Sequence, residues 1–263
     1  MTDLAGPPGT NQFGGDVKVL PNGNYVVVDQ YYQPPGRNIQ TGGVFLYSRD
    51  GTLISTLTGS RADDRVGSGG ITVLANGNFV IVSYRWDNGD NSRGIDAGAV
   101  TWGSMTTGVS GEVSPENSLV GTSYDDQIGD SSQTRGLGGV VALSNGNYVV
   151  CSPTWTWLNG APPLRSAGAV TWGDGTKGVT GVISEANSLV GTAVGMAVGQ
   201  NLNGGGVTEV GGGNYVVSTP YWKNGSLNGL GAVTWCDGKT GRTGPITPEN
   251  SLVGTQAGDT VGG

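Results

Sequence analysis

Short apolar segments recur along the chain in pairs, and a glycine turn separates the two members of each pair. In the first pair, residues 17–20 and 25–28 flank the turn Asn22, Gly23 and Asn24. The equivalent turns begin at Asn76, Asn145 and Gly212. Asn-Gly between β-prone segments predicts a hairpin with a type I′ turn, because both residues tolerate positive φ. The second segment of each pair is apolar at successive positions, which indicates a strand covered on both faces.

A third strand follows each hairpin after a loop of variable length. Its sequence is Gly-Ala-Val-Thr-Trp in three units, ending at Trp102, Trp172 and Trp235, and a degenerate form occupies residues 42–46. We expect these tryptophans to pack between neighbouring sheets. A Gly-rich turn comes next, then a Ser-Pro-Glu type segment with room for one helical turn at most, and then a last short strand.

The order of these segments predicts a repeat protein. We expect four units, residues 13–66, 67–128, 129–198 and 199–263, which together form one domain over residues 1–263. Four short antiparallel strands per unit are typical of the blades of a β-propeller. The predicted fold is all-β, a closed four-bladed ring in which residues 252–263 latch beside residues 13–20. An open array of the same sheets is the alternative.

Composition changes this picture in a few respects. The 263 residues include 51 Gly and are 35 % hydrophobic, as expected for many tight turns around a core. The net charge is −7, and no segment concentrates Lys or Arg, so nucleic acid is not an expected partner. No apolar run reaches the roughly 18 residues that a membrane-spanning helix needs, so membrane insertion is not expected either. Cys151 and Cys236 occupy different repeats, and we expect free thiols buried in strands.

Candidate catalytic chemistry is sparse. The chain contains no histidine, which excludes Ser-His-Asp triads, Cys-His pairs and histidine-ligated metals. Its carboxylates recur at equivalent positions in successive units, whereas a catalytic pair occurs once, so turn and capping roles are expected and an enzyme is not. The recurring positions are Asp64, Asp126 and Asp259 at the unit boundaries, and Glu116, Glu185 and Glu249 in the later turns.

Aromatic side chains provide the candidate binding residues. They stand at the ends of the second strands, where the loops of variable length begin, and in repeat proteins such variation gathers on one face that often binds a ligand. Flat rings beside Asn, Asp and Arg suit stacking on sugars, and rings that merely cover the core are the alternative. The candidate ligand-binding residues are Tyr32, Tyr84, Trp86, Trp155, Trp157, Tyr221 and Trp222.

The repeats resemble a known family. The Gly-Ala-Val strand, the Gly-rich turn after it and the Asp-x-x-Val-Gly boundary are similar to FG-GAP repeats, the blades of integrin-α-like propellers, and resemble most the variants found in large haemagglutinin- or adhesin-like bacterial surface proteins. The resemblance implies a non-catalytic extracellular or cell-surface module, with any signal sequence outside this chain, that presents a scaffold for protein or glycan recognition. FG-GAP blades often bind calcium through Asp-x-Asp-x-Asp-Gly loops. That spacing is absent here, so no metal or cofactor is expected.

Two further hypotheses belong to different classes. One is a lectin that uses the strand-end aromatics. The other is a subunit of an extracellular filament that self-associates through exposed sheet edges.

Overall fold

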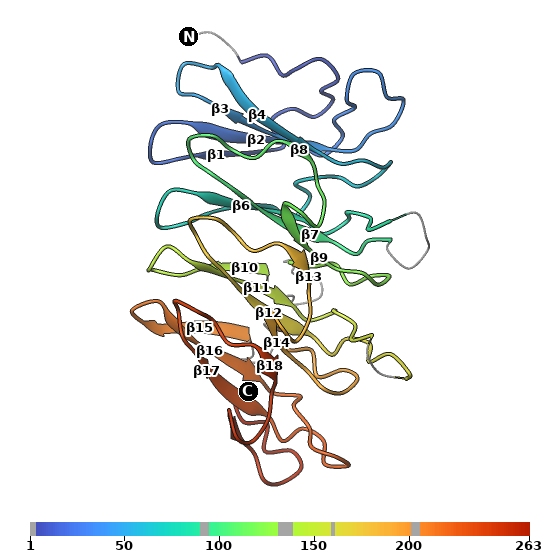
Figure 1. The fold of residues 1–263 in the computed structure, drawn as a ribbon, viewed down its shortest axis with the longest axis vertical. Helices are drawn as coiled ribbons and strands as arrows, with labels where there is room; N and C mark the ends of the chain where they lie inside the picture. The colour runs from blue at the N-terminus through green and yellow to red at the C-terminus, as the bar shows by residue number, and fades with distance from the viewer. Residues whose placement is uncertain (1–3, 90–94, 131–138, 159–160, 201–205) are drawn as a thin grey trace.

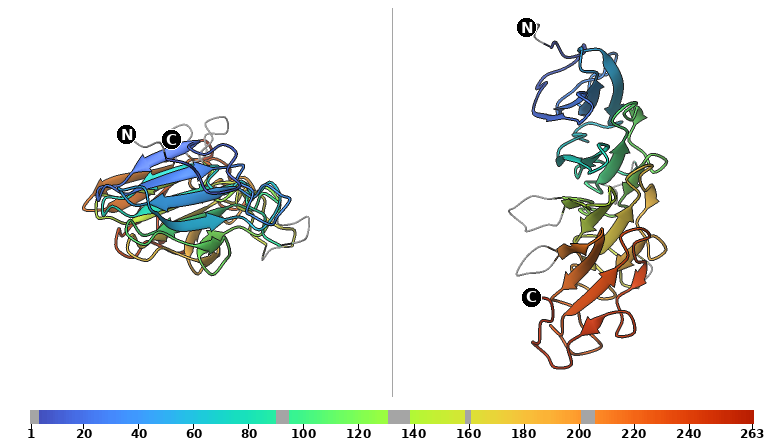
Figure 2. Two further views of the ribbon diagram at one scale, coloured as in Figure 1. Left: turned by 90° about the horizontal axis from the view of Figure 1, so that it is seen from above. Right: turned by 90° about the vertical axis from the view of Figure 1, so that its left-hand side faces the viewer.

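The computed structural model describes residues 4–89, 95–130, 139–158, 161–200 and 206–263. These residues fold into strands, turns and loops, and they form no helix long and apolar enough to cross a membrane. Four sheets follow one another along the long axis, with the chain ends at opposite ends of the stack (Figure 1; Figure 2, right). The all-β repeat architecture predicted from the sequence is therefore confirmed.

Each sheet contains four strands of its own unit in an antiparallel arrangement, and the first three sheets gain a fifth strand at one edge. The first sheet contains β1 (Asp16–Val19), β2 (Tyr25–Asp29), β3 (Gly43–Tyr47), β4 (Leu53–Thr58) and β8 (Gly111–Glu112). The second contains β5 (Gly70–Val73), β6 (Phe79–Ser83), β7 (Ala99–Gly103), β9 (Ser118–Val120) and β13 (Gly181–Val182). The third contains β10 (Gly139–Ala142), β11 (Tyr148–Ser152), β12 (Ala169–Gly173), β14 (Ser188–Val190) and β18 (Gly244–Pro245). The fourth contains β15 (Gly206–Gly211), β16 (Asn214–Thr219), β17 (Ala232–Cys236) and β19 (Leu252–Val253).

The fifth strand of each sheet comes from the following unit. We call the segment between the third and fourth strands of units two, three and four the arm (residues 104–117, 174–187 and 237–251). Each arm reaches back and adds one short parallel strand to the preceding sheet: β8 to β4, β13 to β9 and β18 to β14. The sequence had predicted that this segment would stay within its own sheet. Parallel strands need a long connection, and here it consists of the first three strands of the following unit and the start of its arm.

The closed four-bladed ring predicted from the sequence is not seen. The sheets stack face to face, and β5 lies against β1 and β10 rather than around a central axis. Residues 252–263 do not latch beside residues 13–20, because β19 pairs with β17 of its own sheet. The stack corresponds to the open array that was the alternative.

The three Asn-Gly turns form hairpins as predicted, but of another turn type, whereas in the fourth hairpin Gly212 and Gly213 have φ +63° and +82°, as the predicted type I′ turn requires. In the first, the Gly23 N–H donates to the Leu20 carbonyl at 2.9 Å, and the Leu20 N–H donates to the Asn24 carbonyl at 2.7 Å. Gly23 has φ +87°, whereas Asn22 stays out of the left-handed region. This arrangement is a type I turn followed by a glycine bulge, not a type I′ turn. The longer loop leaves the asparagine side chains free to reach the next unit.

Apolar side chains fill each space between sheets. Three buried clusters join the first sheet to the second, the second to the third, and the third to the fourth. Representative members from facing sheets are Leu46 and Phe79, Leu119 and Tyr148, and Leu189 and Tyr215. The central strands β6 and β11 are buried at every position, as their continuous apolar sequences predicted. Burying each such side chain contributes about 1.5–3 kcal/mol, so these layers hold the stack together.

The tryptophans of the third strands mark where an arm crosses. The Trp102 indole N–H donates to the Gly175 carbonyl of the next arm at 3.0 Å, and its side chain covers Gly178. A Cβ at Gly178 would lie 2.6 Å from the Trp102 Cβ, so only glycine lets the arm approach. Trp172 and Gly241 repeat the contact one unit later. Packing between sheets, predicted for these tryptophans, is confirmed for both.

We expect Gly178→Ala to destabilise the chain more than Gly181→Ala. Both glycines have positive φ, +81° and +93°, but nothing lies within 4 Å of a Cβ at Gly181. Backbone strain should cost each variant about 1–2 kcal/mol, and the contact with Trp102 should add about 1–3 kcal/mol for Gly178→Ala alone. Urea unfolding measures both, and equal losses would contradict the packing of the arm under Trp102.

Candidate functional site

Four of the seven candidate aromatics are buried and belong to the core. Tyr32, Trp86, Trp155 and Trp222 are 5 %, 3 %, 4 % and 3 % exposed. The last three share a cluster with the first apolar residue after the short strand of their own arm, and the Trp222 indole donates to the Ile246 carbonyl at 3.2 Å. The expectation that these four contact a ligand is corrected: the three tryptophan rings help to hold the arm against the preceding sheet, and Tyr32 packs on Phe45 of the first sheet.

The other three candidates differ in their surroundings. Tyr84 is half-buried under the Arg85 guanidinium, which lies 5.6 Å from the ring centre. Tyr221 is 41 % exposed, and Trp157 is half-buried with its ring stacked on Trp155 at 6.5 Å between centres. They belong to three different units, so the structure does not bring them together into one site.

Trp157 is held at the base of a small loop in the third unit. Its N–H donates to the Leu164 carbonyl at 3.1 Å, and the Leu164 N–H donates back at 2.9 Å. Pro162 and Pro163 stiffen the returning side, because the pyrrolidine ring fixes φ. The loop thus presents Trp157 in a defined orientation where the arm of the third unit crosses to the second sheet.

A groove runs beside Trp157. It consists of two adjoining hollows of about 560 Å³ and about 200 Å³, which share Thr156 and Leu158. Three apolar side chains on its border are well exposed: Tyr124 at 52 %, Leu158 at 47 % and Val182 at 42 %. The remaining lining residues are Thr122, Ser123, Trp155, Trp157, Pro162, Pro163, Arg165, Ile183, Ser184 and Glu185. Apolar walls with a few polar groups are usual for a small-molecule site.

Sequence reasoning found only part of this groove. The variable loop after β11 and Trp157 were singled out, but Tyr124 and Arg165 were not. Tyr124 lies after β9, and the junction between units two and three, with the arm strand and the Thr156–Asp126 hydrogen bond, brings this segment beside the loop. A sequence pattern that describes the elements of a single unit carries no information about the contacts between two units.

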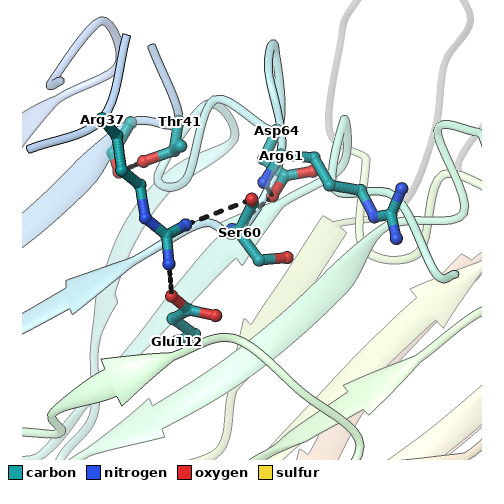
Figure 3. Close-up of polar contacts among 7 residues, drawn as sticks. Arg37, Thr41, Ser60, Arg61, Asp64 and Glu112 are labelled. Carbon is teal, nitrogen blue, oxygen red and sulfur yellow. Dashed lines mark hydrogen bonds and ion pairs between the residues drawn. The ribbon is translucent and has the colours of Figure 1, made fainter. Parts of the chain in front are cut away.

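The boundary aspartates have the structural role that their repetition predicted. The Asp64 carboxylate accepts the Ser60 and Arg61 N–H groups at 2.8 and 2.9 Å (Figure 3), and the Asp87 N–H of the next unit at 3.1 Å. Asp126 accepts three N–H groups in the same way, the third from Thr156. Each aspartate therefore fixes a turn and ties it to the following unit.

Burial raises the pKa of Asp64 and of Asp126 to about 6, although the backbone N–H groups oppose this shift. Neither carboxylate is paired with the other across a cleft, because they lie in successive units. The arrangement supports folding rather than acid–base chemistry.

An ion pair also crosses the first junction. The Arg37 guanidinium contacts the Glu112 carboxylate on β8 and donates to the Ser60 carbonyl at 3.2 Å (Figure 3). Both side chains are well exposed, so the pair contributes little to stability and mainly orients the loop.

Metal and thiol chemistry have little support in this part of the molecule. Among the described residues no group of three or more Cys, Asp or Glu side chains is placed to hold a metal ion. Cys151 and Cys236 are free and buried, as predicted, and burial raises the pKa of each thiol to about 12. Such thiols are unreactive at neutral pH.

The comparison with known families agrees with the unit structure. A model described as a repeat of unknown function, DUF5650, matches residues 73–130, 142–200 and 209–263, which is more than half of the chain. The chain belongs to the DUF5650 repeat family. Each DUF5650 match begins within the first strand of a unit and continues through the second strand, the variable loop, the third strand, the arm and the fourth strand, so the matched repeats correspond to units two to four. No curated protein matches the sequence.

The first unit lies outside the DUF5650 matches and differs in structure. Its third and fourth strands, β3 and β4, are joined by a tight turn closed by the Gly51 N–H on the Ser48 carbonyl at 2.9 Å. This unit therefore has no arm. In a repeat array, a divergent terminal unit serves as a cap.

We expect Trp155→Ala and Trp157→Ala to differ in stability, because one ring is in the core and the other borders the groove. Trp155→Ala should cost about 3–5 kcal/mol, and Trp157→Ala should cost less than about 2 kcal/mol. Thermal and urea unfolding measure both. A larger loss for Trp157→Ala would place that ring in the core and remove it from the binding site.

Stability should rise as the pH falls from 7 towards 5. The folded chain holds Asp64 and Asp126 at a pKa of about 6, above the ordinary 3.8, so in this window it binds more protons than the unfolded chain. The rise from 3.8 to about 6 corresponds to at most about 3 kcal/mol per carboxyl, lost again as the pH rises through 6.

Urea unfolding at pH 7 and pH 5 tests this dependence. Asp126→Asn should be less stable than the wild type at both pH values and should gain less on acidification. Carboxyls whose pKa is lowered, such as Asp174, stabilise the folded chain at pH 5 and pH 7 alike, and this stabilisation is lost only at more acidic pH. A wild-type chain that loses stability between pH 7 and pH 5 would show that the aspartates are ionised without penalty.

Proposed function

We propose that this chain is a non-catalytic recognition module of a bacterial surface protein, and that the groove beside Trp157 binds a glycan. The observation that carries the proposal is the position of Trp157. Two candidate aromatics line the groove among the described residues, and of these Trp155 is 4 % exposed, which leaves Trp157 as the ring that can meet a ligand. The surface location and the adhesin-like setting rest on the resemblance in sequence.

The chemistry of the groove supports a sugar as ligand. A pyranose ring has an apolar face that packs on aromatic and aliphatic side chains, and Trp157, Tyr124 and Leu158 offer such surface. Its hydroxyl groups need donors and acceptors at the edge, which Thr156 and Arg165 provide. The two adjoining hollows, about 560 Å³ and about 200 Å³, have room for a terminal residue of a glycan.

The lining also supports binding without catalysis. Glycoside hydrolysis usually requires two carboxyl groups that flank the scissile bond. In the described part of the chain, Glu185 is the single carboxylate that lines either hollow. The stack itself is the scaffold: the sheets and arms hold the groove, and the variable loops supply the contacts.

A glycan array followed by calorimetry with the best ligand tests the proposal. Trp157→Ala should lose at least about tenfold in affinity, equivalent to about 1.4 kcal/mol, because the stacking surface is gone. Tyr221→Ala is the matched control, since Tyr221 is also an exposed strand-end aromatic but does not line the groove. Its affinity should be unchanged.

Two results would contradict the proposal. One is a wild-type chain that binds nothing on the array. The other is an equal loss of affinity in the two variants, which would show that the glycan does not bind in the groove.

A further inference from the structure

Every junction between neighbouring sheets uses the same strand addition. The residue after each arm strand donates its N–H to the edge of the preceding sheet: Val113 to Thr58 at 2.9 Å, Ile183 to Val120 at 3.1 Å and Ile246 to Val190 at 3.1 Å. The three donor side chains are 2–3 % exposed. A Gly-x-Val or Gly-x-Ile segment from the next unit therefore completes each of the first three sheets.

A second contact lies at the tip of the arm. The carbonyl of Gly175 accepts N–H groups from the side chains of Asn76 and Asn78 at 2.7 and 2.8 Å, and from the Trp102 indole at 3.0 Å. Gly238 accepts the same set from the third sheet. One carbonyl thus gathers three donors from the sheet before it.

The third contact is the boundary carboxylate. Asp64 and Asp126 each accept one N–H from the residue that follows the buried tryptophan of the next unit. Both aspartates are fully buried in consequence.

The fourth sheet carries most of these groups, with Gly212 in the place of Asn76 and Asn145, and in the described structure nothing completes them. Its edge strand β19 pairs only with β17. Leu252 is 71 % exposed, whereas its equivalents Leu119 and Leu189 are fully buried. Trp235 is 49 % exposed, and the Asp259 carboxylate receives the Thr255 and Gln256 N–H groups but none from a further unit. The fourth sheet thus presents an unpaired edge strand like those that receive an arm strand in the other three sheets.

The opposite end of the stack is closed. Residues 4–15 fold over the outer face of the first sheet, where Phe13 packs on Phe45 and Tyr47 at 5.9 and 6.0 Å between ring centres. The N–H groups of Asn11 and Gln12 bind the Asp29 carboxylate. The first unit also has no arm to donate. A second copy cannot offer its N-terminal end to the fourth sheet.

We infer that the C-terminal face, formed by Trp235, Leu252, Val253 and Asp259, is a docking surface for a further DUF5650 repeat. That repeat adds the Gly-x-Val/Ile strand of its arm in parallel to β19 and places an arm carbonyl on Trp235. The strand addition occurs three times within the chain, and the tryptophan and aspartate contacts occur twice each, so the occupant follows from continuity with these interfaces. This inference is independent of the glycan groove.

A chain extended by one repeat tests the inference. A second copy of residues 201–263 is joined directly after Gly263. Gly262 and Gly263 then stand before the added copy as Gly199 and Gln200 stand before residue 201 in the original unit. Leu252→Cys in the original unit provides the probe, because Cys151 and Cys236 are buried and do not compete. Its reaction with a disulfide reagent should be at least about tenfold slower in the extended chain than in the 263-residue chain.

Two controls separate docking from the mere presence of extra residues. Val19→Cys, 72 % exposed on β1 of the first sheet, should react equally in both chains. In an extension whose copy of Ile246 is changed to Asp, Leu252→Cys should react as fast as in the 263-residue chain, because a buried charge prevents strand addition.

Unchanged reactivity of Leu252→Cys in the extended chain would overturn the inference, whether the added repeat folds separately or stays unfolded. Sedimentation of the 263-residue chain should show a monomer. A dimer that protects Leu252→Cys would instead assign the face to a second copy, and this too would overturn the inference.

Discussion

The short strand that each arm lends to the preceding sheet is the interaction on which the rest of the structure depends. Unpaired backbone groups at a sheet edge are costly, and the arm satisfies them with a neighbour's N–H and carbonyl groups. At the same crossing, an apolar residue of the arm enters the core between two sheets. Hydrogen bonding and apolar burial therefore act at one place, and the units are fixed in order and orientation together.

This device explains why the molecule is a stack and not a ring. In a propeller the last blade must return to the first, whereas here each unit interacts with the one before it and the one after it. The two ends of the stack consequently differ in how their outer sheets are covered. The first sheet is covered by residues 4–15, and the fourth sheet presents the same edge and side chains that arms cover elsewhere. Stability in such an array is expected to be a sum of unit and junction contributions.

The arms also explain the position of the groove. Val182 and Glu185 belong to the arm of the third unit, and Tyr124 belongs to the segment that leaves the second sheet. The groove exists because these elements of two units meet beside the loop of Trp157. The buried aromatics one position further in, such as Trp155, stabilise the arm, so recognition and folding depend on adjacent rings with different roles.

The sequence by itself determined the local elements. Alternating and continuous apolar runs defined the strands, glycines that require positive φ defined the turns, and recurring carboxylates such as Asp126 indicated turn roles that the structure confirms. What it could not determine was which sheet receives the strand near Gly181, or that Trp86 would be buried while Trp157 borders a groove. A repeating pattern shows which side chains and strand edges each unit must bury. Either the unit's own sheet or a neighbouring sheet could cover them. Only the tertiary structure decided between them, because the pairing of an edge depends on the geometry of two units packed face to face.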